Sequence, residues 1–263
     1  MKTNKPLNSL DDVPKDKKLV VFDLDGTLTE SKSPVDQETG LLLGQLLQTK
    51  KIAVIGGGKY ELFQRQLLSK LLVTKELLAN LYLFPMTATS FYKYEGSNWS
   101  EVYSQYFSKE EKEKILAAFE KTFQELNYKH PEKIYGELIE DRGSQVTFSV
   151  FGQEAPLELK EKWNKNHSDT RLKIEEVLQK HLLDMEVKLA GLTSIDVTRK
   201  GIDKGYGIKQ IEKYLNTPIQ NMLFVGDDFT HEGNDEPTLK TGVLCFEVKE
   251  PDDTKKLIKY LLE

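Results

Sequence analysis

The sequence has little cysteine, no excess of positive charge and no long apolar run. Cys245 is the single cysteine, so no disulfide can form within the chain, as is typical of proteins in the reducing cytoplasm. The formal net charge is -5, so the chain lacks the positive field that nucleic-acid binding requires. No apolar run approaches the roughly 18 residues of a membrane-spanning helix. The opening stretch MKTNKPLNSLDDVPKDKK is polar, so we also expect no signal peptide.

Short apolar stretches alternate with helical patterns at both ends of the chain. Residues 19–24, 51–55 and 81–84 are buried-strand candidates, and helical spacing of leucines fills residues 35–49 and 60–72 between them. The same alternation returns near the carboxyl terminus, with strands predicted at 221–225 and 242–246 and helices at 207–215 and 254–262. This order predicts a parallel α/β sheet flanked by helices.

The middle of the chain has a different pattern. Residues 91–106 are aromatic and irregular, and charged helices are predicted at 109–126 and 168–181. Residues 145–151 alternate polar and apolar, as a half-buried antiparallel strand does, and two more strands are predicted at 186–192 and 194–197. We therefore expect a core domain of residues 1–85 and 190–263, with an inserted α+β domain at 86–189.

Three of the predicted strands end in the polar or glycine-rich turns FDLDGT, VIGGGK and VGDD. The carboxyl ends of parallel strands share one edge of a sheet, where ligands bind. Four acids should therefore converge there: Asp23, Asp25, Asp227 and Asp228. Clustered carboxylates repel one another unless a cation neutralises them, and oxygen ligands suit Mg²⁺. Lys204, which precedes a predicted helix, is a candidate partner for a phosphate.

These motifs together resemble the haloacid dehalogenase superfamily, subfamily IIB. FDLDGTLT is similar to the first superfamily motif, DKGYGI to the segment that carries the lysine, and GDDFTHEGND to the last motif in its phosphomannomutase form. VIGGGKYELFQRQL resembles the second motif region. The resemblance runs from about residue 17 to the end of the chain and is looser in the middle. It implies a Rossmann-like core with a C2-type cap domain, which selects the substrate.

The resemblance also implies roles for individual residues. Asp23 would be the nucleophile that forms an aspartyl-phosphate, Asp25 the acid and base, and Lys204 the phosphate partner. Mg²⁺ would be bound by Asp23, the backbone carbonyl of Asp25, and Asp227. Thr27 is expected to steady Asp25 and is a candidate for phosphate binding. Three further residues are candidates to support the ion's ligands: Asp228, Asn234 and Asp235.

The glycine-rich second motif departs from the superfamily, which usually has serine or threonine there. Gly57, Gly58 and Lys59 could bind phosphate through backbone N–H groups and the lysine charge, or could simply form a flexible turn between strand and helix. The sequence favours neither interpretation.

The stretch EDRGSQVTFSVFGQ resembles the part of phosphomannomutases in which arginines bind the distal phosphate of the sugar. Arg142 matches the first arginine, Gln153 stands at the second, and Lys160 aligns loosely with a third. A neutral residue weakens an anion site, so the sequence favours a phosphatase of hexose phosphates or similar small phosphorylated metabolites. The alternatives are a phosphomannomutase and a phosphosugar-binding protein without activity. For Arg142 the alternative role is a salt bridge to Glu140 or Asp141. The resemblance separately suggests a homodimer formed through the cap, because relatives often dimerise there.

Overall fold

The computed structural model describes residues 5–31, 33–231 and 233–263. It divides into two compact units: Met1–Ser104 together with Ile202–Glu263, and Gln105–Gly201. The chain therefore leaves the first unit once and returns to it, as the sequence predicts for an inserted domain. None of the helices in the described ranges is long and apolar enough to cross a membrane.

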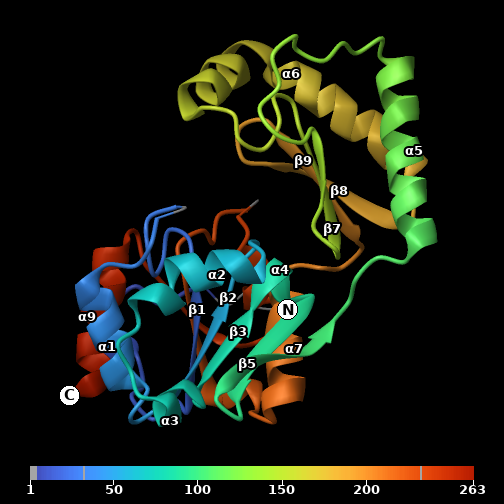
Figure 1. The fold of residues 1–263 in the computed structure, drawn as a ribbon. Helices are drawn as coiled ribbons and strands as arrows, with labels where there is room; N and C mark the ends of the chain where they lie inside the picture. Colours follow the sequence, from blue (N-terminus) through green and yellow to red (C-terminus); the bar gives the residue numbers. More distant parts are fainter. Residues whose placement is uncertain (1–4, 32, 232) are drawn as a thin grey trace. The chain divides into compact units, whose positions relative to one another are not determined.

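The first unit contains a seven-stranded sheet (Figure 1). Its strands, in spatial order, are β11 (Leu244–Glu247), β10 (Met222–Gly226), β1 (Leu19–Asp23), β2 (Lys51–Ile55), β3 (Leu81–Phe84), β4 (Ser90–Glu95) and β5 (Asn98–Ser104). The first five strands are parallel, and β4 and β5 are antiparallel to their neighbours. The parallel α/β core expected from the sequence is confirmed.

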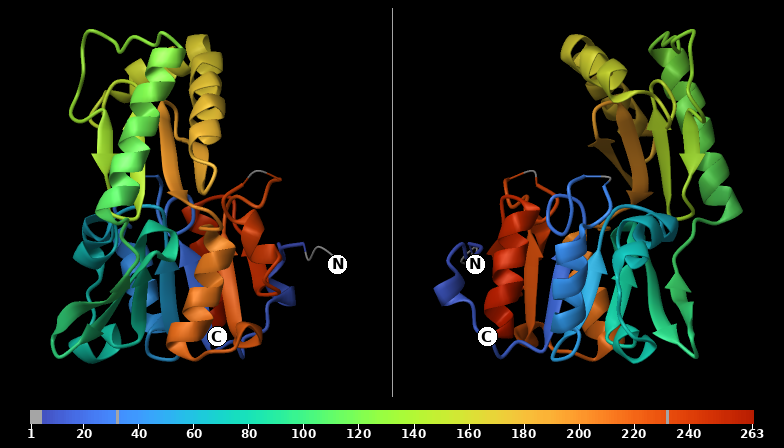
Figure 2. Two further views of the ribbon diagram at one scale, coloured as in Figure 1. Left: turned by 90° about the vertical axis from the view of Figure 1, so that its right-hand side faces the viewer. Right: turned by 60° about the vertical axis from the view of Figure 1, so that its left-hand side comes forward.

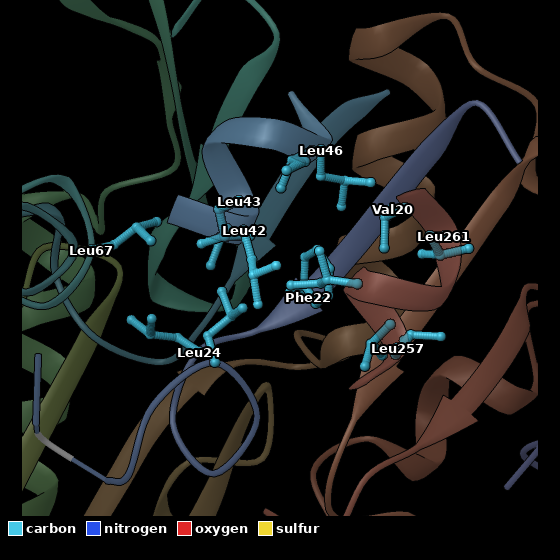
Figure 3. Packing of buried hydrophobic residues seen from close by; sticks show 14 of the residues in the cluster. Val20, Phe22, Leu24, Leu42, Leu43, Leu46, Leu67, Leu257 and Leu261 are labelled. Atoms are coloured by element: carbon cyan, nitrogen blue, oxygen red, sulfur yellow. The ribbon is translucent and has the colours of Figure 1, made fainter. Parts of the chain in front are cut away.

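Helices cover both faces of this sheet. Val20 and Phe22 pack with leucines of α1 (Gln37–Leu46) and α9 (Pro251–Leu262) on one face (Figure 3). Leu19 and Val21 point to the opposite face, where α7 (Lys204–Leu215) lies. Because both faces are buried, the strands read as continuous apolar runs. The remaining short helices of the unit are η1 (Leu10–Asp12), α2 (Tyr60–Gln66), η2 (Leu68–Lys70), α3 (Lys75–Leu78), α4 (Pro85–Ala88), η3 (Ile219–Asn221) and α8 (Glu236–Leu239).

The helix ends have local causes. The side chain of Asp36 accepts a hydrogen bond of 2.8 Å from the backbone N–H of Thr39 and so begins α1. Asp203 caps α7 in the same way by accepting from Tyr206 N–H, and that helix ends at Asn216, which is left-handed with φ of 47°. The cap at Asp203 places Lys204 in the first turn of α7, at the carboxyl edge of the sheet.

The hairpin of β4 and β5 differs from the sequence prediction, which assigned residues 91–106 to the inserted domain. The hairpin extends the core sheet because β4 pairs with β3, with Tyr82 opposite Lys93. The ring of Phe91 also stacks on Phe84 of β3 with centroids 4.5 Å apart. The boundaries of the inserted unit, Gln105–Gly201, therefore lie later at both ends than the predicted 86–189.

The second unit is an antiparallel sheet with two long helices on one face (Figure 2). The strand order is β6 (Ile139–Asp141), β7 (Gln145–Ser149), β9 (Ser194–Arg199) and β8 (Met185–Ala190). Alternate residues such as Val146 and Phe148 pack under α5 (Lys109–Glu125) and α6 (Leu157–His181). This confirms the expected α+β character and leaves the polar residues of β7 on the opposite face of the sheet.

Candidate active site

The ends of β1 and β10 bring together residues that are 200 positions apart in the sequence. Thr27 Oγ1 donates a hydrogen bond of 3.1 Å to Asp227 Oδ1. A Cβ atom on Gly26 would lie 2.4 Å from Asp227 Oδ2, so this close approach requires glycine. The hydroxyl of Thr27 is therefore bonded to Asp227, and the expected roles of Thr27 in steadying Asp25 and in binding phosphate stay predictions.

Lys204 lies between two buried carboxylates. Its Nζ is 2.8 Å from Asp23 Oδ1 and 2.5 Å from Asp235 Oδ1, and it also donates to Asn234 Oδ1 at 2.6 Å. The side chains of Lys204 and Asp23 are each 5% exposed, and that of Asp235 is fully buried. Lys204 and Asp23, predicted as partners from opposite ends of the chain, are therefore in direct contact, and Asn234 supports the lysine.

Asp235 organises the loop after β10. Its Oδ2 accepts hydrogen bonds of 3.0 Å from the backbone N–H groups of both Asp227 and Asp228. A Cβ atom on Gly226 would come within 2.4 Å of the same oxygen. Asp228 accepts a hydrogen bond of 2.7 Å from the hydroxyl of Thr230, and its predicted supporting role beside the ion stays a prediction. The motif residue 232 lies outside the described residues.

The acids of this cluster repel one another. Burial is the main cause that raises the pKa of Asp23, to about 7; Lys204 opposes the rise, and Asp235 and Asp227 add to it. Burial and the charge of Asp235 likewise raise the pKa of Asp227. Burial disfavours the charged form of Lys204, but the neighbouring carboxylates outweigh it and raise the pKa of the lysine. The lysine is therefore charged at neutral pH, and one ammonium group is not enough to balance three carboxyls.

The donor set fits a divalent cation. One oxygen each from Asp23, Asp227 and Asp235 lie within 4.8 Å of one another. Carboxylate oxygens are the ligands that Mg²⁺ prefers, and a cation there would relieve the repulsion that raises the carboxyl pKa values. Asp235 enters this cluster although the sequence indicated only a supporting role. The predicted contribution of Asp25, its backbone carbonyl, stays a prediction.

Asp25 has a partner that the sequence analysis missed. Its half-buried carboxylate accepts a hydrogen bond of 3.0 Å from Gln66 Nε2. Gln66 is buried at the end of α2, beside the apolar residue Leu67. The sequence did contain a signal for this contact, because Gln66 is a polar residue within the apolar face of the helix predicted at 60–72.

The glycine-rich loop after β2 is held by an unusual turn. Gly56 and Gly58 accept hydrogen bonds through their carbonyl groups, from the backbone N–H groups of Thr87 at 2.9 Å and Met86 at 3.0 Å. Met86 and Thr87 have φ of 53° and 54°, in the left-handed region, which costs roughly 1–2 kcal/mol for each non-glycine residue. Gly57 faces open space, with no atom within 4 Å of a Cβ position, and Lys59 is the N-cap of α2. Phosphate binding by Gly57, Gly58 and Lys59 stays a prediction.

In the second unit the three positions aligned with arginines lie together. Arg142 Nη2 donates to Gln153 Oε1 at 3.3 Å, and Lys160 Nζ donates to the backbone carbonyl of Gln153 at 3.2 Å. Arg142 also forms the salt bridge to Glu140 that the sequence offered as its alternative role, with Nε 2.7 Å from Oε2. The guanidinium is thus already paired with an acid.

Comparison with known proteins gives one family. The family model described as eukaryotic phosphomannomutase matches residues 41–263. The phosphomannomutase of Saccharomyces cerevisiae is 27% identical over 249 residues, covering 92% of this chain and 93% of that protein. Phosphomannomutase 1 of Homo sapiens is 27% identical, covering 84% of this chain and 82% of that protein.

Solved structures share the fold at lower identity. Truncated IMP-nucleotidase of Plasmodium falciparum has a TM-score of 0.67 at 18% identity, covering 96% of this chain and 70% of that one. Trehalose-6-phosphate phosphatase of Aspergillus fumigatus has a TM-score of 0.58 at 18% identity, covering 98% and 99% of the two chains. These likenesses support the fold expected from the sequence, a parallel α/β core with an inserted α+β domain.

Proposed function

Because the chain belongs to the eukaryotic phosphomannomutase family, we propose that it moves a phosphoryl group between two positions of a hexose phosphate, most directly mannose 1-phosphate and mannose 6-phosphate. The observation that carries the proposal is the contact between Lys204 and Asp23 at the carboxyl edge of the parallel sheet. The phosphatase favoured by the sequence becomes the second candidate, since matches to phosphomannomutases cover 92% of the chain at 27% identity.

The chemistry would proceed in two half-reactions. The Asp23 carboxylate attacks phosphorus, the bond from phosphorus to the sugar oxygen breaks, and Asp25 gives its proton to that oxygen. In the second half, Asp25 takes a proton from the attacking hydroxyl and the phosphoryl group leaves Asp23. Lys204 neutralises charge beside the nucleophile, which matters because phosphoryl transfer depends mainly on positioning and charge stabilisation. A sugar hydroxyl as acceptor gives a mutase, and water gives a phosphatase.

Mg²⁺ is the proposed cofactor. Asp23 and Asp227 would hold it, with Asp235 beside them, because these three carboxylates converge. When bound, the ion supplies positive charge to the phosphoryl oxygens and keeps Asp23 ionised. Asp235 has both oxygens engaged already, one by Lys204 and one by the two backbone N–H groups, so it would chiefly orient the loop that carries Asp227.

One observation favours the phosphatase. A mutase must bind a bisphosphate, and hence a second anion, in the cap. Gln153 is neutral, and Arg142 is already paired with Glu140. A guanidinium that is already bonded to a carboxylate has less of its charge and fewer donors to offer a phosphate. The second unit of this chain is therefore a weaker anion site than a set of unpaired arginines would be.

A single assay separates the candidates. Mannose 1-phosphate with Mg²⁺ and a catalytic amount of hexose bisphosphate is followed by phosphorus NMR. A mutase converts it to mannose 6-phosphate only when the bisphosphate is present, whereas a phosphatase releases inorganic phosphate without it. If neither interconversion nor phosphate release is observed, the protein is a phosphosugar-binding protein and the proposal is refuted. Asp23→Asn is the control that should abolish both.

Gln153→Arg tests the basis of the choice. The added guanidinium should raise the ratio of interconversion to phosphate release, because a second anion is then bound more firmly. An unchanged ratio would show that this position does not contact the distal phosphate.

The homodimer through the cap is a separate proposal. Light scattering coupled to size-exclusion chromatography tests it by measuring the mass of the protein in solution.

A further inference from the structure

Gln66 connects the second helix to the residue proposed as the proton donor. Its Nε2 donates to Asp25 Oδ1 and to the backbone carbonyl of Ser33, each at 3.0 Å. Its own backbone carbonyl accepts from Val35 N–H at 2.8 Å. The residue is 2% exposed. These three bonds tie the end of α2 both to Asp25 and to the segment that follows the first motif.

The orientation of the Gln66 amide follows from its neighbours. Both groups that it faces, a carboxylate and a carbonyl, are acceptors, so the nitrogen must be the atom directed at them. This leaves Oε1 buried, and none of the described residues donates a hydrogen bond to it. An unsatisfied buried acceptor costs about 1–3 kcal/mol. An apolar side chain of similar volume would avoid that cost, so stability alone does not account for glutamine at this position.

We propose that Gln66 is a positioning residue for Asp25, an inference that rests on the proposed function. An N–H donated to Oδ1 fixes the rotation of the carboxyl group and makes Oδ1 the accepting oxygen. The transferable proton is then carried by the other oxygen, Oδ2. In the first half-reaction this proton passes to the leaving sugar oxygen as its bond to phosphorus breaks and the bond from Asp23 to phosphorus forms. The bond to Ser33 keeps the amide in place during the transfer.

The test uses the dependence of the rate on the leaving group. Gln66→Met keeps the volume of the side chain and removes its N–H donor. An alkyl phosphate such as mannose 6-phosphate needs a proton for its leaving alcohol, whereas 2,4-dinitrophenyl phosphate releases a stable anion without one. Misplacing a proton donor by about 1 Å can reduce the rate roughly 100-fold. We therefore expect kcat/KM, which covers the steps up to formation of the aspartyl-phosphate, to fall about 10–100-fold for the sugar phosphate and to change less than about threefold for the aryl ester.

The control is Gln64→Met, which alters an exposed glutamine on the same helix and should leave both rates unchanged. The Tm of Gln66→Met should stay close to that of the parent, because the substitution removes the unsatisfied acceptor Oε1 together with the donor Nε2. Equal losses on both esters, or no loss on either, would overturn the role of Gln66. A parent protein that turns over neither ester in the presence of Mg²⁺ and hexose bisphosphate would instead refute the proposed function.

Discussion

Replacing Lys204 with methionine removes the positive charge from between Asp23 and Asp235 while keeping most of the side-chain volume. The two carboxylates are then left in a site where they are 5% and 0% exposed. Removing one partner of a buried ion pair typically destabilises a protein by about 3–5 kcal/mol. At about 2–4 °C per kcal/mol for a chain of this size, Tm should fall by roughly 6–20 °C.

The loss should depend on pH in a defined direction. Burial already raises the pKa of Asp23 to about 7 in the native protein, and without Lys204 it would rise further. A carboxyl group with a raised pKa binds its proton more tightly in the folded state, so its unfavourable contribution grows as pH rises from about 4 through that pKa. The deficit of Lys204→Met should therefore be larger at pH 8 than at pH 5.5.

The assay is thermal unfolding of parent and variant in EDTA at both pH values. Lys209→Met, an exposed lysine of the same helix, is the matched control and should change stability by less than about 0.5 kcal/mol. A deficit below about 1 kcal/mol, or one that is the same at both pH values, would refute the reasoning that Lys204 neutralises two buried acids.

Other perturbations test separate parts of the account. Mg²⁺ at about 100 times its dissociation constant should stabilise the parent by about 2.7 kcal/mol in a thermal-shift assay, and Asp227→Asn should lose most of that gain; equal shifts would place the ion elsewhere. Thr87→Gly should raise the free energy of unfolding by about 1 kcal/mol by relieving left-handed strain, and a decrease measured in urea would contradict this. Asp36→Asn keeps the helix cap but removes a carboxylate whose pKa is lowered to about 2, first by its hydrogen bond to Lys255. Because that carboxylate stabilises the native state above pH 4 and stops doing so as pH falls toward 2, the variant should lose less stability over this range; parallel pH curves would show that the ion pair contributes nothing.

The core strands could be predicted because their burial is uniform. Residues 51–55 and 81–84 form strands with the predicted limits, because nearly all of their side chains are buried between helices on the two faces and read as short apolar runs. The hairpin of β4 and β5 was missed because its aromatic residues do not alternate cleanly with polar ones. The sequence did contain a local signal for the turn, the pair Gly96 and Ser97. In the structure these residues have φ of 59° and 75°, as expected of a two-residue hairpin turn.

The convergence of Asp23, Asp227 and Lys204 could also be predicted, because the carboxyl ends of parallel strands share one edge. The partners of Thr27 and Asp25 could not. Thr27 and Asp227 are 200 positions apart, and Gln66 reaches Asp25 only because α2 packs beside the first motif. Such side-chain hydrogen bonds depend on distances that no local pattern encodes, and the central place of Asp235 depends on the path of the loop after β10.

The central claim is that Asp23 carries the phosphoryl group during turnover. It is tested most directly by quenching the enzyme in acid during turnover of a sugar phosphate and reducing the acyl phosphate with borohydride. Reduction converts the phosphorylated side chain to an alcohol, and this label is located by mass spectrometry of the peptides. The account predicts that the label lies on Asp23 and that Asp23→Asn carries none. Turnover with the label on another residue, or without any labelled residue, would contradict it.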